Sequence, residues 1–465
     1  MKVSKLLPKF TVIAVLSLLS ALSSFAQNPQ IRTTYIDLGT WAVLRLDRAG
    51  LNIPAPSVLY EPVTPGDKSQ VAVLLMDPEK DYLADPVCAD LSKRGYRVLC
   101  ANSDVVKTQF SRDITMDGIM ADVGSGVAYL RQYPGVRKVV LLGHGEGGAL
   151  MSAYQNVAEN GLKACRGPEK IIKCSDDVAH LTPADGVMLI DSDWGPAAMM
   201  LFSQDPAVLN EEGGQLLNPA MDMYNPANGF KPAGSSYSGE FIRKFFSAEE
   251  KRYNYLIKAA QDRMDAINAG KGHYSDNEPF FAPGAGLADV NLYAQDLRLM
   301  SHTRNAWPLL HADGSITTQI VRSVRVPAKQ TSLTRSFRDG ALRSTVRGFL
   351  KMYSIRTTDD YGYDEDSVHG VDWSSNYSNP PGNVQSIISP LLVMGMTGHW
   401  EYLASETIFE DAKSADKTLI FVEGASHDLT TCKECEKYPG QFGDTRKNTY
   451  DQIDRWLSQK GRFIN

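Results

Sequence analysis

Short apolar runs alternate with amphipathic segments from about residue 57 to residue 190. Apolar runs of this length, bounded by turn residues, are typical of strands that are buried on both faces of a parallel sheet. We expect strands at 57–61, 71–76, 96–101, 139–142 and 186–190. We expect helices between them at 85–94, 115–133 and 147–159. Strands that alternate with helices in this way predict βαβ units, a mostly parallel sheet and right-handed crossovers.

The strand pattern stops from about Trp194 to Pro380, and this segment is rich in Asn, Gly, Pro, Tyr and Met. It contains one clear amphipathic helix, which we expect to begin at the capping box Ser247–Glu250 and to end at Gly270. We interpret the whole segment as a cap inserted between two strands of the sheet. The apolar stripe of the helix is expected to pack on the core domain rather than on a membrane.

The sheet pattern resumes after the cap. Strands are expected at 391–394 and 418–423, and helices at 402–412 and 445–458. The predicted organisation is a first part of the core at 27–193, a cap at 194–380 and a second part of the core at 381–465.

The first 26 residues predict a cleaved secretory signal. Lys2, Lys5 and Lys9 form a basic region, an apolar run follows, and Ser24–Ala26 ends in small residues. The apolar run is short for a membrane span, and no later stretch is long and apolar enough to be one. No Cys follows at a lipobox position. We therefore expect a chain without a membrane span, in the periplasm or outside a bacterium.

Charge and cysteine content support that assignment. A net charge of -6 and a pI near 5.8 do not indicate a protein that binds nucleic acid or an anionic membrane. The even number of six Cys predicts disulfides in an oxidising compartment. Cys165 and Cys174 are expected to pair, and Cys88 and Cys100 could meet. The CKEC stretch at 432–435 is either a small local disulfide or half of a metal site, although no second CxxC or HxxxH accompanies it.

The stretch KVVLLGHGEGGA at 138–149 carries the most informative motif. It predicts a buried strand, a sharp glycine-rich turn and a helix that opens at Gly147. This order is typical of the G-x-S-x-G nucleophile elbow, where glycines are needed because a Cβ would clash. Aligned without gaps, the serine position is occupied by Gly145. The glycine spacing does not fit the dinucleotide-binding fingerprint.

Three pieces of the chain resemble the α/β-hydrolase superfamily: VVLLGHGEGG, ISPLLVMGMTG and VEGASHDL. The resemblance covers nearly the whole chain after residue 26. It implies an α/β fold with a mostly parallel central sheet, flanking helices and a large inserted cap. It also implies that His427, in the third piece, stands where the family keeps its catalytic histidine. The stretches 222–230 and 416–430 resemble a subgroup of secreted bacterial or fungal members with large caps.

The family's nucleophile is absent, because Gly145 has no side chain. Glu146 comes one residue after the position of the family's serine. In the elbow the residue at that place supplies its backbone N–H to the oxyanion hole. Glu146 could serve as nucleophile or general base, but a structural role near the helix N-terminus is favoured. His144 is expected to support the site, and Ser192 is the nearest alternative hydroxyl.

The acid and the oxyanion turn also depart from the family's pattern. No Asp follows the strand at 391–394, so the acid could be Glu401, or Asp191 or Asp193 at the end of the preceding strand. The turn Asp77-Pro78-Glu79 should supply the second oxyanion N–H. Because Pro78 has none, Asp77 or Glu79 must donate it.

Metal and cofactor sites are not expected. His144, Glu146, His399 and His427 could lie near one edge of the sheet, but they lack a compact ligand spacing. The first functional hypothesis is a secreted hydrolase acting on an ester, lactone or related acyl substrate. The alternative is a catalytically inactive pseudo-hydrolase that binds a small apolar ligand or a protein partner. In either case a small molecule would bind beneath the cap, and the oligomeric state is not predicted.

Overall fold

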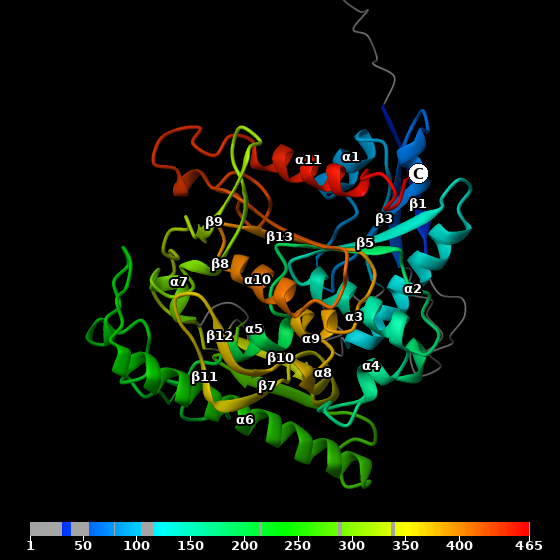
Figure 1. Cartoon of the computed structure of the whole chain (residues 1–465). Helices are drawn as coiled ribbons and strands as arrows, with labels where there is room; N and C mark the ends of the chain where they lie inside the picture. Colours follow the sequence, from blue (N-terminus) through cyan, green and yellow to red (C-terminus); the bar gives the residue numbers. More distant parts are fainter. Residues whose placement is uncertain are drawn as a thin grey trace, which may run out of the picture.

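The computed structural model describes residues 30–38, 55–78, 80–103, 115–213, 216–286, 291–335 and 340–464. The expected signal segment at 1–26 lies outside these residues. A ten-stranded sheet forms the centre of the molecule (Figure 1). In spatial order its strands are β1 (Ile31–Asp37), β2 (Pro56–Pro62), β4 (Arg97–Ala101), β3 (Val71–Leu75), β5 (Lys138–His144), β6 (Gly186–Ile190), β13 (Leu391–Met396), β14 (Lys417–Val422), β8 (His302–Leu310) and β9 (Ile316–Arg322).

The strands from β4 to β8 are parallel, and antiparallel pairs close both edges. This topology is that of the α/β-hydrolase fold, as the sequence predicts. The expected strands and helices of the core lie where predicted, within one or two residues at most of their ends. The strand β1 was not predicted, because residues 28–56 carry no clear pattern.

Helices cover both faces of the sheet because alternate residues of each buried strand point to opposite sides. Val73 packs in one apolar cluster with Ile453, and its neighbour Leu74 packs in the other with Val123. The first face is covered by α1 (Pro86–Lys93) and α11 (Thr445–Leu457). The second is covered by α2 (Met116–Gln132), α3 (Gly147–Asn160) and α10 (Tyr402–Asp411) (Figure 1).

The cap lies beyond the second face, at the bottom of Figure 1. Its long helix is α6 (Gly239–Asn268), and two small antiparallel sheets pair β10 with β7 and β11 with β12. Its other elements are α5 (Pro196–Phe202), β7 (Pro279–Pro283), α7 (Leu292–Gln295), β10 (Ala341–Thr345), α8 (Val346–Met352), β11 (Arg356–Tyr363) and β12 (Val368–Asp372). The short helices α4 (Lys163–Arg166) and α9 (Pro380–Val384) lie in connections of the core.

Two expectations for the segment 194–380 are wrong. The segment does contain strands, and β8 and β9 extend the central sheet beyond β14. These strands escape the sequence pattern because β9 is exposed at nearly every position and Pro308 interrupts β8. The long helix begins at Gly239, where the side chain of Ser238 accepts the N–H of Phe241, so the capping box at 247–250 lies inside it.

All six cysteines form disulfides between neighbours in sequence. The pairs are Cys88–Cys100, Cys165–Cys174 and Cys432–Cys435. The CKEC stretch is therefore a local disulfide and not half of a metal site. It lies in the loop between β14 and α11, in which Cys432 donates its N–H to the carbonyl of Gly424 at 2.8 Å.

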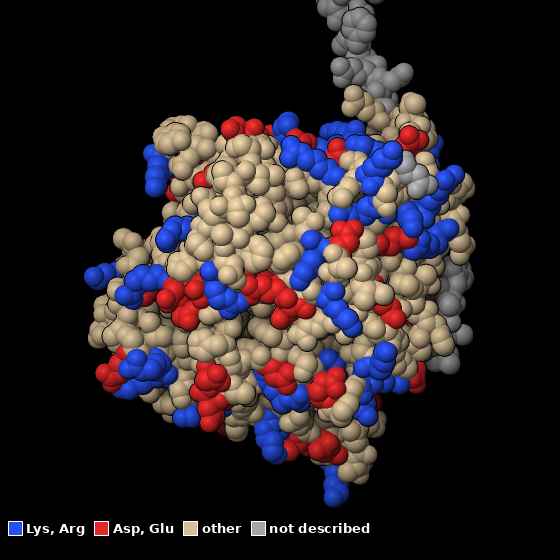
Figure 2. Space-filling view, viewed as in Figure 1, with Lys and Arg blue, Asp and Glu red and all other residues tan. Residues whose placement is uncertain are grey.

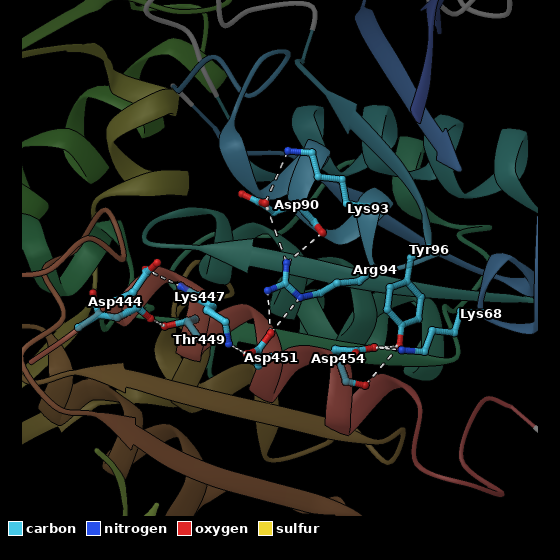
Figure 3. A network of polar contacts seen from close by, with 11 residues as sticks. Lys68, Asp90, Lys93, Arg94, Tyr96, Asp444, Lys447, Thr449, Asp451 and Asp454 are labelled. Atoms are coloured by element: carbon cyan, nitrogen blue, oxygen red, sulfur yellow. Dashed lines mark hydrogen bonds and ion pairs between the residues drawn. The ribbon is translucent and has the colours of Figure 1, made fainter. Parts of the chain in front are cut away.

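Ion pairs hold α11 against α1 (Figure 3). Lys68 Nζ lies 2.5 Å from Asp454 Oδ1, and Arg94 Nη2 lies 2.7 Å from Asp451 Oδ1. Both carboxylates belong to α11, whereas Arg94 ends α1 and Lys68 precedes β3. Because α11 follows the loop after β14, these contacts fix the C-terminal end of that loop.

Charged side chains on the outer surface are mixed in sign. On the face shown in Figure 2, Lys and Arg side chains lie among Asp and Glu side chains. That face offers no continuous basic surface of the kind that binds phosphates of nucleic acid. Among the described residues, no helix combines the length and the apolar character needed to cross a bilayer.

A buried ion pair fastens the cap to the core. Lys351 of α8 places Nζ 2.5 Å from Oδ2 of Asp117, in the first turn of α2. The same oxygen accepts the N–H of Ser175 at 2.7 Å. Burial opposes ionisation of Asp117, but Lys351 and these hydrogen bonds outweigh it and lower its pKa. The carboxylate is thus charged and paired with the cap.

We predict that Lys351→Met destabilises the protein by about 3–5 kcal/mol, because it leaves the Asp117 carboxylate buried without its cation. Urea unfolding at pH 7 measures the loss. The matched control is Lys258→Met, which removes an exposed pair with Asp262 on α6 and should change stability far less. If the two substitutions lower the free energy of unfolding equally, the buried pair between cap and core contributes no more to stability than an exposed pair.

Candidate active site

The candidate site lies where several parallel strands end at one edge of the sheet. The carboxyl ends of such strands meet at the same edge, which is where α/β folds place their ligands. Most of the candidate residues lie at or just after the ends of β3, β5, β6, β13 and β14: Asp77, His144, Gly145, Glu146, Asp191, Ser192, Asp193, His399, Glu401 and His427.

The elbow between β5 and α3 is built as predicted. Gly145 has a φ of +56°, a left-handed conformation that side chains disfavour. Its N–H donates to the carbonyl of Ile190 at 3.2 Å, and its own carbonyl accepts the N–H of Gly148 at 3.0 Å. A Cβ on Gly143 would lie 2.3 Å from the carbonyl oxygen of Gly147, so the turn requires glycine there.

The ring of His427 lies directly against Gly145. A Cβ on Gly145 would lie 2.9 Å from both Cε1 and Nε2 of that ring. Real Cβ atoms do not approach ring atoms this closely without displacement. The histidine therefore occupies part of the space that a nucleophile side chain would need.

His427 is paired with Asp191. Its Nδ1 lies 2.9 Å from Asp191 Oδ2. A carboxylate can only accept, so Nδ1 carries the proton, and Nε2, which lies beside Gly145, has a lone pair. Burial lowers the pKa of His427, but the hydrogen bond and charge of Asp191 outweigh burial and raise it above the ordinary value. The pair has the hydrogen-bonding pattern of a general base with its orienting acid.

Asp191 is held rigidly at the end of β6. Its side chain is fully buried and its φ is +43°, an unusual value for a residue with a side chain. Its N–H donates to the carbonyl of Met394 at 2.7 Å, and its Oδ1 accepts the N–H of Met396 at 3.0 Å. Burial opposes ionisation, but contacts with His399 and His427 outweigh it and hold the pKa of Asp191 well below its usual range.

His144 supports the backbone that carries His427. Its Nε2 lies 2.6 Å from the carbonyl oxygen of His427, and its Nδ1 lies 2.9 Å from the hydroxyl of Tyr82. A carbonyl can only accept, so Nε2 donates and Nδ1 accepts from Tyr82. Burial, followed by the nearby His427, lowers the pKa of His144 to about 3, which keeps its ring neutral. The two histidine rings are stacked with centroids 4.7 Å apart.

Glu401 lies beside the pair but makes a longer contact. Its Oε2 is 3.6 Å from Nδ1 of His427 and 3.6 Å from Nδ1 of His399. Asp191, at 2.9 Å, is the carboxylate that hydrogen-bonds His427. Burial and the neighbouring carboxylates Asp193, Asp191 and Glu146 raise the pKa of Glu401 well above its ordinary value.

The remaining candidates surround this centre. Glu146 occupies the N-cap position of α3, and its side chain makes no capping hydrogen bond there. Asp77 is buried, and its Oδ1 accepts the N–H of Lys80 at 2.7 Å. Asp193 accepts the N–H of Gly195 at 2.7 Å, and burial, with Asp77 and Asp191 nearby, raises its pKa.

Ser192 is fully buried beneath the elbow, where a Cβ on Gly148 would collide with its Oγ. It is therefore packed away from the open side of His427. Of the two residues expected to complete the oxyanion hole, Glu79 lies outside the described residues.

Two cavities adjoin the site. One of about 240 Å³ lies between α1, α11 and the sheet, and is lined by His144 and by apolar residues such as Leu142 and Ile453. Another, of about 160 Å³, lies between cap and core and includes Arg325 and Trp400 in its lining. The second is the cavity that corresponds to a ligand position beneath the cap.

Two site residues carried little signal in the sequence. The sequence suggests His399 only as a member of a metal-ligand set, yet its Nδ1 lies 3.1 Å from Asp191 Oδ2. Tyr82 stands alone in a loop before α1, where no sequence motif marks it. The position of His399 after a predicted strand was the signal that could have placed it beside His427.

Comparison with known proteins supplies similarity of fold only. No family model and no curated protein matches the chain. A hypothetical protein from Pseudomonas aeruginosa is similar in structure, with a TM-score of 0.42, 12% identity and coverage of 94% of this chain and 95% of that one. Carboxyl esterase 2 from Tuber melanosporum gives a TM-score of 0.38 at 11% identity, covering 95% and 90%. Dienelactone hydrolase from Anabaena variabilis gives a TM-score of 0.36 at 8% identity, and the match covers 94% of this chain and 100% of that one.

We predict that Gly145→Ala is more destabilising than a substitution that adds backbone strain alone. The left-handed backbone costs about 1–2 kcal/mol, and displacing the His427 ring adds about 1–3 kcal/mol. The control is Gly270→Ala, at a φ of +68° with nothing within 4 Å of the added Cβ. Denaturant unfolding compares the two.

A second background isolates the collision. In a His427→Ala protein, Gly145→Ala should cost no more than Gly270→Ala, because the ring is gone. If the cost of Gly145→Ala is the same in both backgrounds, His427 does not occupy the nucleophile's space.

Proposed function

We propose that the chain is a secreted hydrolase that cleaves an ester, lactone or related acyl bond with water as the nucleophile. The observation that carries the proposal is the 2.9 Å hydrogen bond between His427 and Asp191, with Cε1 and Nε2 of the histidine ring beside Gly145. Because Gly145 carries no hydroxyl, the lone pair of Nε2 is available to a water molecule instead of a serine. His427 would then activate a water molecule rather than a serine hydroxyl.

The proposed reaction needs no covalent intermediate. His427 Nε2 takes a proton from the water as its oxygen attacks the acyl carbon, and Asp191 stabilises the imidazolium that forms. The N-terminus of α3 favours the negative charge that develops on the carbonyl oxygen. The imidazolium then returns the proton to the leaving oxygen, which yields a carboxylic acid and an alcohol.

The buried carboxylates near His427 limit the charge of the substrate that the site can accept. Asp193 and Glu401 both have raised pKa values because they are buried close to other carboxylates. The ionised carboxylate is Asp191, whose pKa is lowered, and its charge would repel a carboxylate substrate, so an uncharged acyl substrate fits better.

The second candidate is a binding protein that retains the fold without the reaction. One observation favours it: the ring of His427 lies so close to Gly145 that a serine could not be restored without displacing it. In that case a small apolar ligand would occupy one of the two cavities, and His427 with Asp191 would have only a structural role.

We predict that His427→Ala lowers kcat/KM for a short p-nitrophenyl ester by about 10²–10⁴-fold, the usual contribution of a general base. Asp191→Asn should act in the same direction, because the amide can no longer hold the required tautomer of His427. Steady-state kinetics of the purified protein measure both.

The matched control is His311→Ala, since His311 also pairs with a carboxylate, Glu423 at 2.7 Å, but on a different part of the sheet edge. This control should hydrolyse the ester at the rate of the unaltered protein. Absence of turnover in the unaltered protein, or turnover that survives His427→Ala, would reject the hydrolase and leave the binding protein.

The pH dependence of kcat/KM follows from the raised pKa of His427. The base works only when neutral, so activity should fall as the pH drops through a midpoint above the ordinary histidine value of about 6.5. Asp191→Asn should move that midpoint of the residual activity downward, because the raising charge is removed. If Asp191→Asn does not shift the midpoint of the pH dependence of kcat/KM, a group other than His427 is responsible for the titration.

A further inference from the structure

Four ligand-type side chains converge on one point at the ends of three neighbouring strands. Asp191 follows β6, His399 and Glu401 follow β13, and His427 follows β14. One donor atom from each lies within 4.8 Å of the other three. The sequence analysis names a different possible set, His144, Glu146, His399 and His427. In the structure Asp191 and Glu401 take the places of His144 and Glu146 in the cluster.

Glu401 is spaced from the two histidine nitrogens as the edges of a tetrahedron around one ion require, whereas Asp191 lies a few tenths of an ångström closer to them. Asp191 Oδ2 lies 2.9 Å from Nδ1 of His427 and 3.1 Å from Nδ1 of His399. Glu401 Oε2 lies 3.6 Å from each of the same two nitrogens. Zinc bonds to nitrogen and carboxylate oxygen are about 2.0–2.2 Å, which gives tetrahedral edges of about 3.3–3.6 Å.

Two of the four donors have no hydrogen-bond partner among the described residues. They are Nδ1 of His399 and Oε2 of Glu401, and both atoms are buried. The residue Glu401 is 7% exposed, yet this oxygen is aimed at two histidine nitrogens that lie too far away for a good hydrogen bond. His399 Nδ1 lies 3.1 Å from Asp191 Oδ2 but makes no hydrogen bond with it, and a buried polar atom without a partner calls for an explanation.

The rest of the surroundings suits a cation. Asp191 and Glu401 bring two carboxyl groups together where solvent is largely excluded, and a bound cation would allow both to be ionised. The second oxygen of Asp191 accepts the N–H of Met396 at 3.0 Å, which orients the carboxylate as the outer contacts of metal ligands do. Two imidazoles with two carboxylates form a donor set that Zn²⁺ accepts.

We propose that Asp191, His399, Glu401 and His427 bind one divalent transition-metal ion of the Zn²⁺ class in tetrahedral geometry. Binding at Nδ1 of His427 displaces the proton that this nitrogen donates to Asp191. The proton of the neutral ring then lies on Nε2, which can no longer accept one from water. The ion and the general base are therefore alternative uses of the same ring, and the metal inhibits hydrolysis. This inhibitory consequence rests on the proposed function, whereas the metal site does not.

Titration of the chelator-stripped, tag-free protein with Zn²⁺ in a calorimeter tests the site without any substrate. We expect one ion per chain. Co²⁺ should give the intense visible absorption of a tetrahedral complex. Glu401→Gln and His399→Ala should each weaken Zn²⁺ binding by more than about 100-fold, because loss of an outer contact alone costs about 10–100-fold.

His311→Ala is the matched control and should bind Zn²⁺ like the unaltered protein. Thermal unfolding in chelator shows whether each variant is folded, and the near-isosteric Glu401→Gln decides the matter if His399→Ala does not fold. Binding that is absent, that survives Glu401→Gln, or that gives the weak Co²⁺ spectrum of an octahedral complex overturns the site.

Ester hydrolysis separates the two proposals. If the stripped protein turns over ester, Zn²⁺ should inhibit with a midpoint equal to the dissociation constant from calorimetry, and activation by Zn²⁺ would overturn the inhibitory role. If the stripped protein binds Zn²⁺ but turns over no ester, the proposed hydrolase fails while the metal site stands. If the stripped protein turns over ester but shows no saturable Zn²⁺ binding, the metal site fails while the proposed hydrolase stands.

Discussion

The carboxylate of Asp191 is the group on which the candidate site depends. It is fully buried, so its charge must be compensated from within the protein. The compensation comes from Met396, His427 and His399, which belong to two other strand ends. Satisfying one buried carboxylate therefore fixes the relative positions of β6, β13 and the loop after β14. The left-handed backbone of Asp191 shows that the chain accepts local strain to place it there.

The elbow and the histidine loop are adapted to each other. Gly145 allows the His427 ring to approach more closely than any residue with a Cβ would. His144, from the same turn, holds the carbonyl of His427 from the other side, and Tyr82 holds His144. The absence of the serine is thus part of a packed arrangement, and a change at Gly145 alone would not recover the usual triad.

The sequence predicts the core of this fold well and the site only in part. Continuous apolar runs such as Val71–Leu75 identify the buried strands, and the glycines around Gly145 identify the turn. The exposed strand β9 gives no such pattern, because an edge strand beside solvent needs no apolar side chains. Ser238 and Ser247 both offer a helix cap, and only tertiary packing shows that α6 uses the first.

The choice of acid shows where reasoning from sequence stops. Asp191, Asp193 and Glu401 all follow buried strands, and each could in principle reach His427. The selection of Asp191 depends on a backbone turn with a φ of +43°, which no sequence pattern indicates for an Asp. The approach of His399 depends on the same turn. Distances between side chains on different strands come from the fold as a whole, not from their spacing along the chain.

The attachment of the cap has a consequence for how a ligand reaches the strand ends. The cap segment contributes β8 to the central sheet through its pairing with β14, and Lys351 joins it to α2 by a buried ion pair. Swinging the cap open as one rigid lid would break both connections. Entry and exit must instead use movements of loops and side chains around the rim, so the rate of ligand exchange is set by local openings and not by a hinge.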